Sequence, residues 1–337
     1  MRFRFLALAA VLAAAPSTAG AQSKTGTAVG QFLLIEPSAR FAAMGNAAVA
    51  LPEGIQSVYY NPGALGGFLG FTAQFTHSEW LAGITYDYAA AALPVRDVGD
   101  FFASVTVLNS GEIDVRTVDK PLGTGERYTV SDLALGLGYG RAFTDRVTAG
   151  IMLSYVSETI WHSSLETATL NIGAAYRVDD EGLRLGASIS NYGSTSSFSG
   201  RDLAIQYDLD PDRYGDNSAL PGERSTDHFP LPVLFRVGAA YPWKTGAKSA
   251  ALFAVDAFHP SDDAESMSLG AEWTWMETLS LRGGYQNLFL KDSEAGLTFG
   301  AGAQGRLGEQ QFSLDYAWAD HGRLDQPHRL TFVVSLR

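Results

Sequence analysis

The sequence predicts an all-β protein, a transmembrane antiparallel β-barrel of about 14 strands. An export signal opens the chain, and apolar residues alternate with small or polar ones from Phe68 onward. Hydrophobic residues make up 46% and aromatic residues 12% of the chain. Because no apolar run of about 18 residues follows the export signal, a helical membrane protein is excluded. A secreted β-sandwich is the alternative, but its outer face is usually charged, whereas the polar face here is rich in glycine, alanine, serine and threonine.

Residues 1–21 are the first element, a predicted signal peptide. Arg2 and Arg4 precede an apolar stretch, and small residues up to Ala21 form a cleavage site. The apolar stretch is too short for a bilayer, which needs about 20 residues. A buried helix of a cytosolic domain is the alternative. Cleavage near Ala21 would export the chain, and we expect it in the outer membrane of a Gram-negative bacterium.

The composition argues against several classes of chemistry. The chain has no cysteine, which excludes disulfide scaffolds and thiol nucleophiles, and its net charge of −12 disfavours nucleic acid as a partner. The six histidines never pair at metal-ligand spacing, and no nucleophile elbow or phosphate loop occurs. The sequence therefore predicts a protein that is not an enzyme, with no catalytic residue, no metal site and no cofactor.

The barrel strands are predicted from alternation and length. In 312–319, Phe312, Leu314, Tyr316 and Trp318 share one face, and the intervening residues are small or acidic. A tilted membrane strand needs about 9–11 residues. The predicted strands are 68–78, 81–92, 100–109, 128–140, 146–159, 166–177, 183–192, 231–241, 249–259, 266–275, 278–287, 296–306, 310–319 and 327–337.

The predicted connections fall into two classes. Every second one is a short polar turn, and the intervening ones include the long stretches 110–127 and 193–230. Short turns at one end and long loops at the other are typical of outer-membrane barrels, and an even number of strands returns the chain to the short-turn end. The short turns are 96–100, 143–146, 178–182, 244–248, 276–278 and 307–310.

Charged residues of the strands lie on the parity opposite the large apolar residues, so we expect them to face the lumen. A lysine or arginine facing lipid at mid-bilayer costs about 2–4 kcal/mol. These residues are Asp87, Asp132, Arg184, Arg236, Asp256, Glu272, Arg282 and Asp315. Four of them, Arg236, Asp256, Glu272 and Arg282, fall on successive strands and predict a ladder of ion pairs. We interpret the ladder as structural filling; a polar conduit is the alternative.

The segment 32–66 carries a recognisable set of short motifs. These are Ser-Ala-Arg at 38–40, the Met44-Gly45 pair, and Tyr-Asn-Pro at 60–62 followed by small residues. The segment resembles the N-terminal signature of the PorV/PorQ family of outer-membrane proteins, a branch of the FadL-like barrels. The resemblance extends over most of the mature chain except 193–230, through 133–156, 281–302 and 314–337. The matched signature residues are Arg40, Met44, Gly45, Asn61 and Pro62.

This resemblance implies a barrel of about 14 strands plugged by its own N-terminal segment. Residues 22–67 would then form a hatch inside the lumen, and 68–337 the barrel. Asn61 followed by Pro62 predicts a capped helical turn in the hatch. The inward-facing glycines at 136, 138 and 140 leave room for its backbone. A disordered leader fits the aromatic and aliphatic content of the hatch poorly.

The resemblance leaves two functional hypotheses. In the first, the barrel is a component of the type IX secretion system, which captures or attaches exported cargo proteins through their C-terminal sorting domain and contacts other secretion subunits. In the second, it is a FadL-like channel for hydrophobic small molecules such as fatty acids or aromatics. Outer-membrane lipid is a partner in both. A purely structural barrel remains as background.

The loop 193–230 is the candidate partner-binding element. Its length far exceeds the usual few-residue connection, and such loops are usually functional or disordered. The aromatic residues Phe198, Tyr207, Tyr214 and Phe229 suit partner contacts, since they bury a large area at little entropic cost. The alternative is a lid folded back over the barrel.

The same loop carries three alternating acidic residues. Asp208, Asp210 and Asp212 imitate the start of a calcium-binding loop, but Arg213 and Ala219 occupy positions where such a loop has glycine and glutamate. A solvated acidic loop is the favoured interpretation, and weak calcium binding is the alternative.

Overall fold

The computed structural model describes residues 25–179, 182–210, 212–213, 215 and 219–336. The predicted signal peptide, residues 1–21, and the loop residue Tyr214 lie outside the described residues. In the described part of the chain, no helix is both long and apolar enough to cross a membrane.

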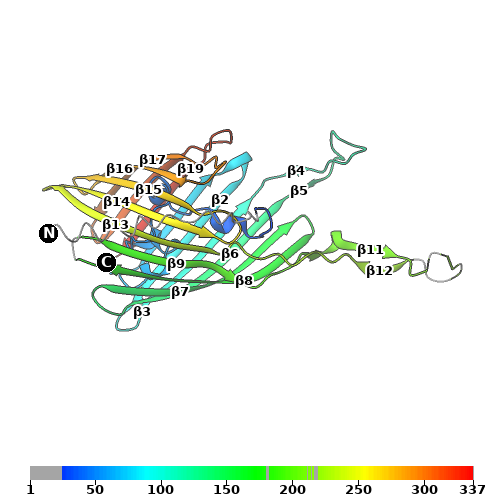
Figure 1. Ribbon diagram of the computed structural model, residues 1–337, viewed down its shortest axis with the longest axis horizontal. Coiled ribbons are helices and arrows are strands. Elements are labelled where there is room, and N and C mark those ends of the chain that lie inside the picture. Colours follow the sequence, from blue (N-terminus) through cyan, green and yellow to red (C-terminus); the bar gives the residue numbers. More distant parts are fainter. Residues whose placement is uncertain (1–24, 180–181, 211, 214, 216–218, 337) are drawn as a thin grey trace.

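The strands form a closed antiparallel barrel (Figure 1). The sheet has 15 strands, of which the two-residue β10 (Ser199–Gly200) is a side branch on β8. The remaining fourteen form a ring, because β1 pairs with β19 and β8 pairs with β9. The ring strands are β1 (Thr72–Glu79), β2 (Thr85–Val95), β3 (Gly99–Asn109), β6 (Val130–Ala142), β7 (Val147–Ile160), β8 (Ser163–Arg177), β9 (Arg184–Gly193), β13 (Leu234–Gly246), β14 (Ser249–Pro260), β15 (Ser266–Trp275), β16 (Leu279–Leu288), β17 (Leu297–Leu307), β18 (Gln310–Ala319) and β19 (His328–Leu336). The predicted fold class is confirmed.

The two ends of the barrel differ as predicted. Short turns join β2 to β3, β6 to β7 and the following alternate pairs at one end, which we call the inner end. The longer loops lie at the other, outer end, and two hairpins project beyond it (Figure 1). One hairpin is β4–β5 (Ile113–Asp114 and Arg127–Tyr128), and the other is β11–β12 (Ala204–Tyr207 and Leu220–Glu223). A short 3-10 turn, η5 (Arg201–Leu203), precedes β11.

The outer wall of the barrel is apolar. Leu137 is 70% exposed, Leu153 is 59% exposed and Phe299 is 52% exposed, each on the face that points away from the lumen. A closed barrel with this apolar belt is stable with lipid around it. The protein is therefore a Gram-negative outer-membrane protein.

Strand β2 corrects one sequence prediction. Asp87 faces outward, where it contacts His77 across the outer rim, with Nδ1 and Oδ1 2.7 Å apart. The inward positions belong to Tyr86 and Tyr88, which are 1% and 4% exposed, and the Tyr86 hydroxyl donates to the Ile35 carbonyl. Because the two tyrosine rings pack in the lumen, the residues between them, including Asp87, face outward. The outward carboxylate is accommodated because it lies at the solvent-exposed outer rim.

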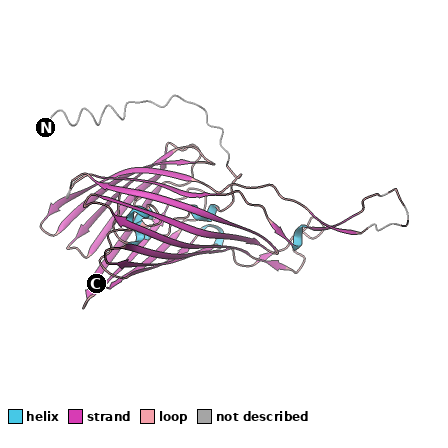
Figure 2. Cartoon of the chain, turned by 90° about the horizontal axis from the view of Figure 1, so that it is seen from below, coloured by secondary structure: helices cyan, strands magenta, loops and turns pink. Residues whose placement is uncertain are grey.

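The described part of the hatch folds as short helical turns inside the barrel (Figure 2). They are η1 (Gln31–Leu34), α2 (Ala39–Ala42), η2 (Ile55–Ser57) and η3 (Pro62–Ala64). Ser38 caps α2 by accepting from the Phe41 amide, and Asn61 caps η3 by accepting from the Gly63 amide. The capped turn predicted at Asn61 and Pro62 is confirmed. The first strand then begins at Thr72.

Candidate functional site

The hatch lies against a wall of glycines. Inward-facing glycines on eight strands let its backbone approach the sheet more closely than any side chain would allow. A Cβ added at any of them would lie between 2.0 and 3.2 Å from a hatch atom. We call this set the glycine wall: Gly138 and Gly140 on β6, Gly150 on β7, Gly173 on β8, Gly186 on β9, Gly238 on β13, Gly270 on β15, Gly284 on β16 and Gly300 on β17.

Asn61 and Pro62 of the predicted hatch signature dock on this wall. The Asn61 side-chain amide donates to the Val49 carbonyl at 2.7 Å and to the Ala174 carbonyl of β8 at 2.9 Å. A Cβ at Gly150 would lie 2.1 Å from the Pro62 carbonyl oxygen. Asn61 therefore binds both another part of the hatch and the barrel wall, and Pro62 packs directly against the wall.

Met44 and Gly45 dock on the opposite part of the same wall. Met44 is fully buried, and its backbone lies against Gly270 and Gly284. Gly45 adopts a left-handed φ of 64° and donates its amide to Thr298 Oγ1 at 3.0 Å. A Cβ on Gly45 would lie 2.7 Å from the Leu269 carbonyl oxygen, so both the turn and the close approach require glycine there.

Arg40, the remaining signature residue, anchors the hatch by charge. Its guanidinium binds Glu272 with two bonds, Nε to Oε2 at 2.9 Å and Nη2 to Oε1 at 2.7 Å. Glu272 also accepts from Arg282, which in turn donates to Asp315 at 2.7 Å. We call Arg40, Glu272, Arg282 and Asp315 the ion network. Within the barrel wall, Arg282 pairs with both Glu272 and Asp315, and all three side chains are almost fully buried. Removing one partner would therefore leave a buried charge unpaired at a large cost in free energy.

Glu53 extends the ion network within the hatch. It contacts Arg40 at 3.3 Å and pairs with Arg184 of β9. Burial alone would raise the pKa of Glu53, but the positive charges of Arg40 and Arg184 outweigh it and lower that pKa below its ordinary value. The Glu53 carboxylate is therefore ionised at neutral pH.

The predicted ladder is divided by the structure. Glu272 and Arg282 pair as expected, but no ion pair joins Arg236 to Asp256 among the described residues. Asp256 instead accepts the hatch amides of Ala48 and Val49 at 2.7 and 2.8 Å. Backbone amides of the hatch bind Asp256 in place of the expected Arg236. The alternation pattern of the strands does not reveal such backbone donors.

Arg236 is a buried cation with aromatic neighbours. It is 3% exposed, and its guanidinium donates to Ser190 Oγ at 3.1 Å. The guanidinium carbon lies 5.4 Å from the Tyr59 ring centroid and 5.9 Å from that of Tyr60. Its Nε has no hydrogen-bond partner in the described part of the chain.

Two chambers lie on the outer side of the hatch. The first, of about 490 Å³, lies between the hatch and β13–β16 and is lined in part by Tyr60, Arg236 and Phe258. The second, of about 620 Å³, is largely apolar. Its apolar lining comes from the hatch and from the barrel rim, and includes Phe32, Ile35, Trp80, Ile84, Leu108 and Phe198. Residues of η1 line both outer chambers.

Two further chambers lie on the inner side of the hatch. They measure about 340 and 260 Å³ and are lined mainly by polar residues. Arg40, Glu53 and Gln56 line both, and Glu272, Arg282 and Asp315 line the larger one. The hatch thus separates chambers with a mainly apolar lining at the outer end, which still include Arg236, from chambers with a mainly polar lining at the inner end.

The candidate loop residues fall into two places. Phe198 and Phe229 contact each other at the base of the loop, with ring centroids 6.4 Å apart, and Phe198 also lines the second outer chamber. Tyr207 lies on the projecting β11–β12 hairpin and is 49% exposed. Among the described residues, no group of three or more acidic or histidine residues is arranged to hold a metal ion.

The sequence did not single out the outer chambers. Trp80 and Ile84 belong to the connection between β1 and β2, and Leu108 belongs to β3. The position of the hatch in the lumen brings Phe32 to them. The signal available in the sequence was the aromatic and aliphatic content of the hatch. That content predicted that the hatch would be buried. It did not predict which part of the barrel wall would face an open chamber.

Comparisons with known proteins identify the fold. No family model matches the chain, and no curated protein matches it by sequence. Among solved structures, the toluene transporter TodX of Pseudomonas putida superposes with a TM-score of 0.55 at 14% identity, over 89% of this chain and 98% of TodX. The toluene transporter TbuX of Ralstonia pickettii gives 0.56 at 12%, over 90% and 98%. A FadL homologue of Pseudomonas aeruginosa gives 0.52 at 10%, over 88% and 96%. The similarity is one of fold, a FadL-like barrel.

Proposed function

We propose that this protein is a non-enzymatic outer-membrane channel for hydrophobic small molecules. The observation that carries the proposal is the pair of outer chambers, of about 490 and 620 Å³, which open at the outer end and are lined by both hatch and barrel. Their size lies within the range of about 300–1,000 Å³ typical of small-molecule sites. The two toluene transporters that share the fold are consistent with this class of solute.

The hatch is the moving part of this channel. Each of the fourteen ring strands is hydrogen-bonded to both neighbours, so the barrel wall is continuous. Hatch residues lie between the outer and inner chambers, and many of them are fully buried. A solute in an outer chamber therefore reaches the inner end when the hatch shifts away from part of the wall.

Uptake by cells that produce a chamber-filling variant tests the proposal. Ile84→Trp places a large ring in the second outer chamber, and Ile113→Trp places the same ring on the β4–β5 hairpin. We expect Ile84→Trp to reduce uptake of toluene or a short fatty acid severalfold, and Ile113→Trp to leave it unchanged. Equal uptake by both variants and the wild type would refute the chambers as the solute site.

The role in type IX secretion remains the second candidate. The feature that favours it is the β11–β12 hairpin, where Tyr207 is 49% and Leu209 is 70% exposed beyond the barrel rim. Replacing 204–223 with a short Gly-Ser turn keeps Phe198 in its chamber. In a channel this variant transports normally. In a secretion component it loses co-purifying exported proteins that share a C-terminal domain.

A further inference from the structure

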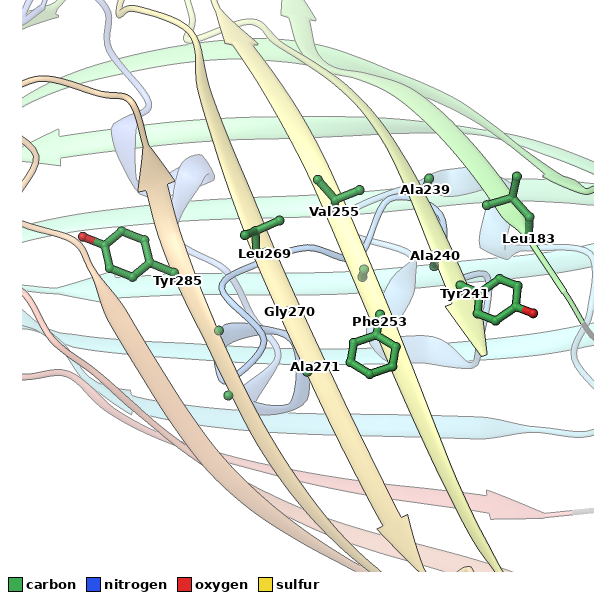
Figure 3. Close-up of a pocket in the computed structure, with 13 residues that line it drawn as sticks. Leu183, Ala239, Ala240, Tyr241, Phe253, Val255, Leu269, Gly270, Ala271 and Tyr285 are labelled. Atoms are coloured by element: carbon green, nitrogen blue, oxygen red, sulfur yellow. The ribbon is translucent and has the colours of Figure 1, made fainter. Parts of the chain in front are cut away.

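Two hollows of the barrel differ in whether their lining carries charge. The lipid-facing wall of β13–β16 contains an apolar groove of about 550 Å³, with Tyr241, Phe253 and Tyr285 along it (Figure 3). None of its described lining residues is charged. The second outer chamber, in contrast, combines an apolar lining with carboxylates. Its lining can therefore discriminate between solutes that have the same shape and different charge.

Two of these carboxylates lie directly opposite each other on the barrel wall. Register pairs Asp132 of β6 with Glu158 of β7 near the outer ends of both strands. Leucines flank the pair, since Leu108 of β3 pairs with Asp132 and Leu165 of β8 pairs with Glu158. Like charges in directly opposite positions destabilise a sheet, and neither carboxylate has a basic residue directly across from it on the other side.

Asp132 lacks a partner of its own. It is 9% exposed, and no hydrogen bond or ion pair joins its carboxylate to another group in the described part of the chain. Glu158 accepts the Gly30 amide of the hatch through Oε1 at 2.7 Å. A buried polar group that is left unsatisfied costs free energy, so a cation that entered the chamber beside Asp132 would remove this cost.

The other titratable groups of the chamber supply no positive charge to this pair. Glu36, the third carboxylate, already accepts from Asn46 and pairs with Arg329, whose Nη2 lies 3.8 Å from Glu36 Oε2. Burial lowers the pKa of His321 in the loop between β18 and β19, so its ring is neutral at pH 7. No lysine or arginine lines the chamber among the described residues.

We propose that the second outer chamber binds hydrophobic amines in their ammonium form, with the nitrogen between Asp132 and Glu158. This inference rests on the proposed channel function and narrows its solute class. The ammonium donates to both carboxylates and favours their ionised form. The apolar body of the amine packs against Phe32, Trp80 and Leu108, and a chamber of about 620 Å³ has room for a phenylalkyl group.

Binding of two solutes of matched shape to the purified protein tests the site. The probes are 2-phenylethylamine, which is an ammonium at pH 7, and 2-phenylethanol, its neutral counterpart. Equilibrium dialysis in a non-ionic detergent should show about tenfold tighter binding of the amine by the wild type. Asp132→Asn and Glu158→Gln should each remove most of this preference and leave the binding of 2-phenylethanol unchanged.

The matched control is Asp119→Asn, which makes the same change at an exposed position between β4 and β5. It should keep the preference of the wild type. Equal binding of the two probes by the wild type, or the same preference in Asp132→Asn and Asp119→Asn, would overturn the proposal. Tight calcium binding that Asp132→Asn abolishes, without a preference for the amine, would overturn it in favour of a metal site.

Ile84→Trp separates this inference from the channel function on which it rests. Because its ring fills the same chamber, the variant should weaken the binding of both probes. If it weakens the binding of 2-phenylethanol and the wild type shows no preference for the amine, the amine site is overturned and the channel stands. If neither probe binds to the wild type, or if Ile84→Trp binds both as the wild type does, both proposals are overturned.

Discussion

The two ends of the lumen differ in what they do to the hatch. At the inner end, Arg40 of the hatch enters the ion network and charged groups satisfy one another in polar chambers. At the outer end, the buried cation Arg236 has aromatic neighbours and an unbonded Nε beside open chambers. The comparison indicates that the inner end holds the hatch in place, whereas the outer end leaves space for a ligand.

Between the two ends, the glycine wall fixes the position of the hatch along the barrel axis. Many of its contacts are with hatch backbone, as where the Pro62 carbonyl meets Gly150, and others are with hatch side chains, as where Asn61 meets Gly173. Such contacts carry no charge and tolerate no added atoms. Close packing therefore sets the position of the hatch along the barrel, and the ion network is one of its attachments to the barrel.

The largest effect is expected when the inner end is broken. Among the described residues, Arg282→Leu leaves Asp315 with Gln56 as its one side-chain partner, and it removes one of the two arginines that pair with Glu272. Removing one partner of a buried pair typically costs about 3–5 kcal/mol. Urea unfolding of the reconstituted barrel should show a loss of this size. An unchanged midpoint would mean that the network does not hold the hatch.

A smaller loss is expected at the glycine wall. Gly150→Val puts side-chain atoms where the Pro62 carbonyl lies, and overpacking typically costs about 1–3 kcal/mol. Gly305→Val is the control, since a Cβ there meets no atom within 4 Å. The measurement is the unfolding free energy of both variants. Equal values would show that the hatch can withdraw from the wall at no cost.

The outer end should respond less to the same kind of change. Arg236→Leu removes one bond to Ser190 and the ring contacts, but it also removes an unbonded Nε. We expect the unfolding free energy to fall by about 1 kcal/mol or less. A loss of unfolding free energy as large as that of Arg282→Leu would show that the outer end holds the hatch as firmly as the inner end.

The smallest effect concerns pH. The pKa of Glu53 is lowered in the folded protein, so its pairing stabilises the fold above the ordinary carboxyl pKa of about 4.3 and is lost as the pH falls through the lower folded value. The wild type should therefore exceed Glu53→Gln in stability at pH 7, and the difference should vanish in acid. Thermal unfolding at several pH values measures it. A difference that grows in acid would reverse the assigned sign.

Sequence periodicity predicted the barrel because each strand carries its own signal. The apolar parity, the strand length and the turn class of β18 can each be read from 310–319 and its flanks. Local chemistry likewise predicted the capped turn at Asn61. These features depend on neighbours in the chain.

The site depended on contacts that the chain does not encode locally. Arg40 and Glu272 are 232 residues apart, and nothing in either neighbourhood identifies the other. The ladder prediction failed at Asp256 because hatch amides bind it, and Asp87 was misplaced because rim solvation allowed the reverse parity. Only the inward glycines indicated where the hatch would lie.

Locking the hatch tests most directly whether it must move for transport. The chain has no cysteine, so Ala39→Cys with Thr331→Cys introduces one pair, at a place where the Ala39 amide donates to Thr331 Oγ1 at 2.9 Å. Uptake of toluene is measured in one preparation, first oxidised and then reduced. We predict that oxidation abolishes uptake and that reduction restores it. Equal uptake in both states would contradict a hatch that moves to open the channel.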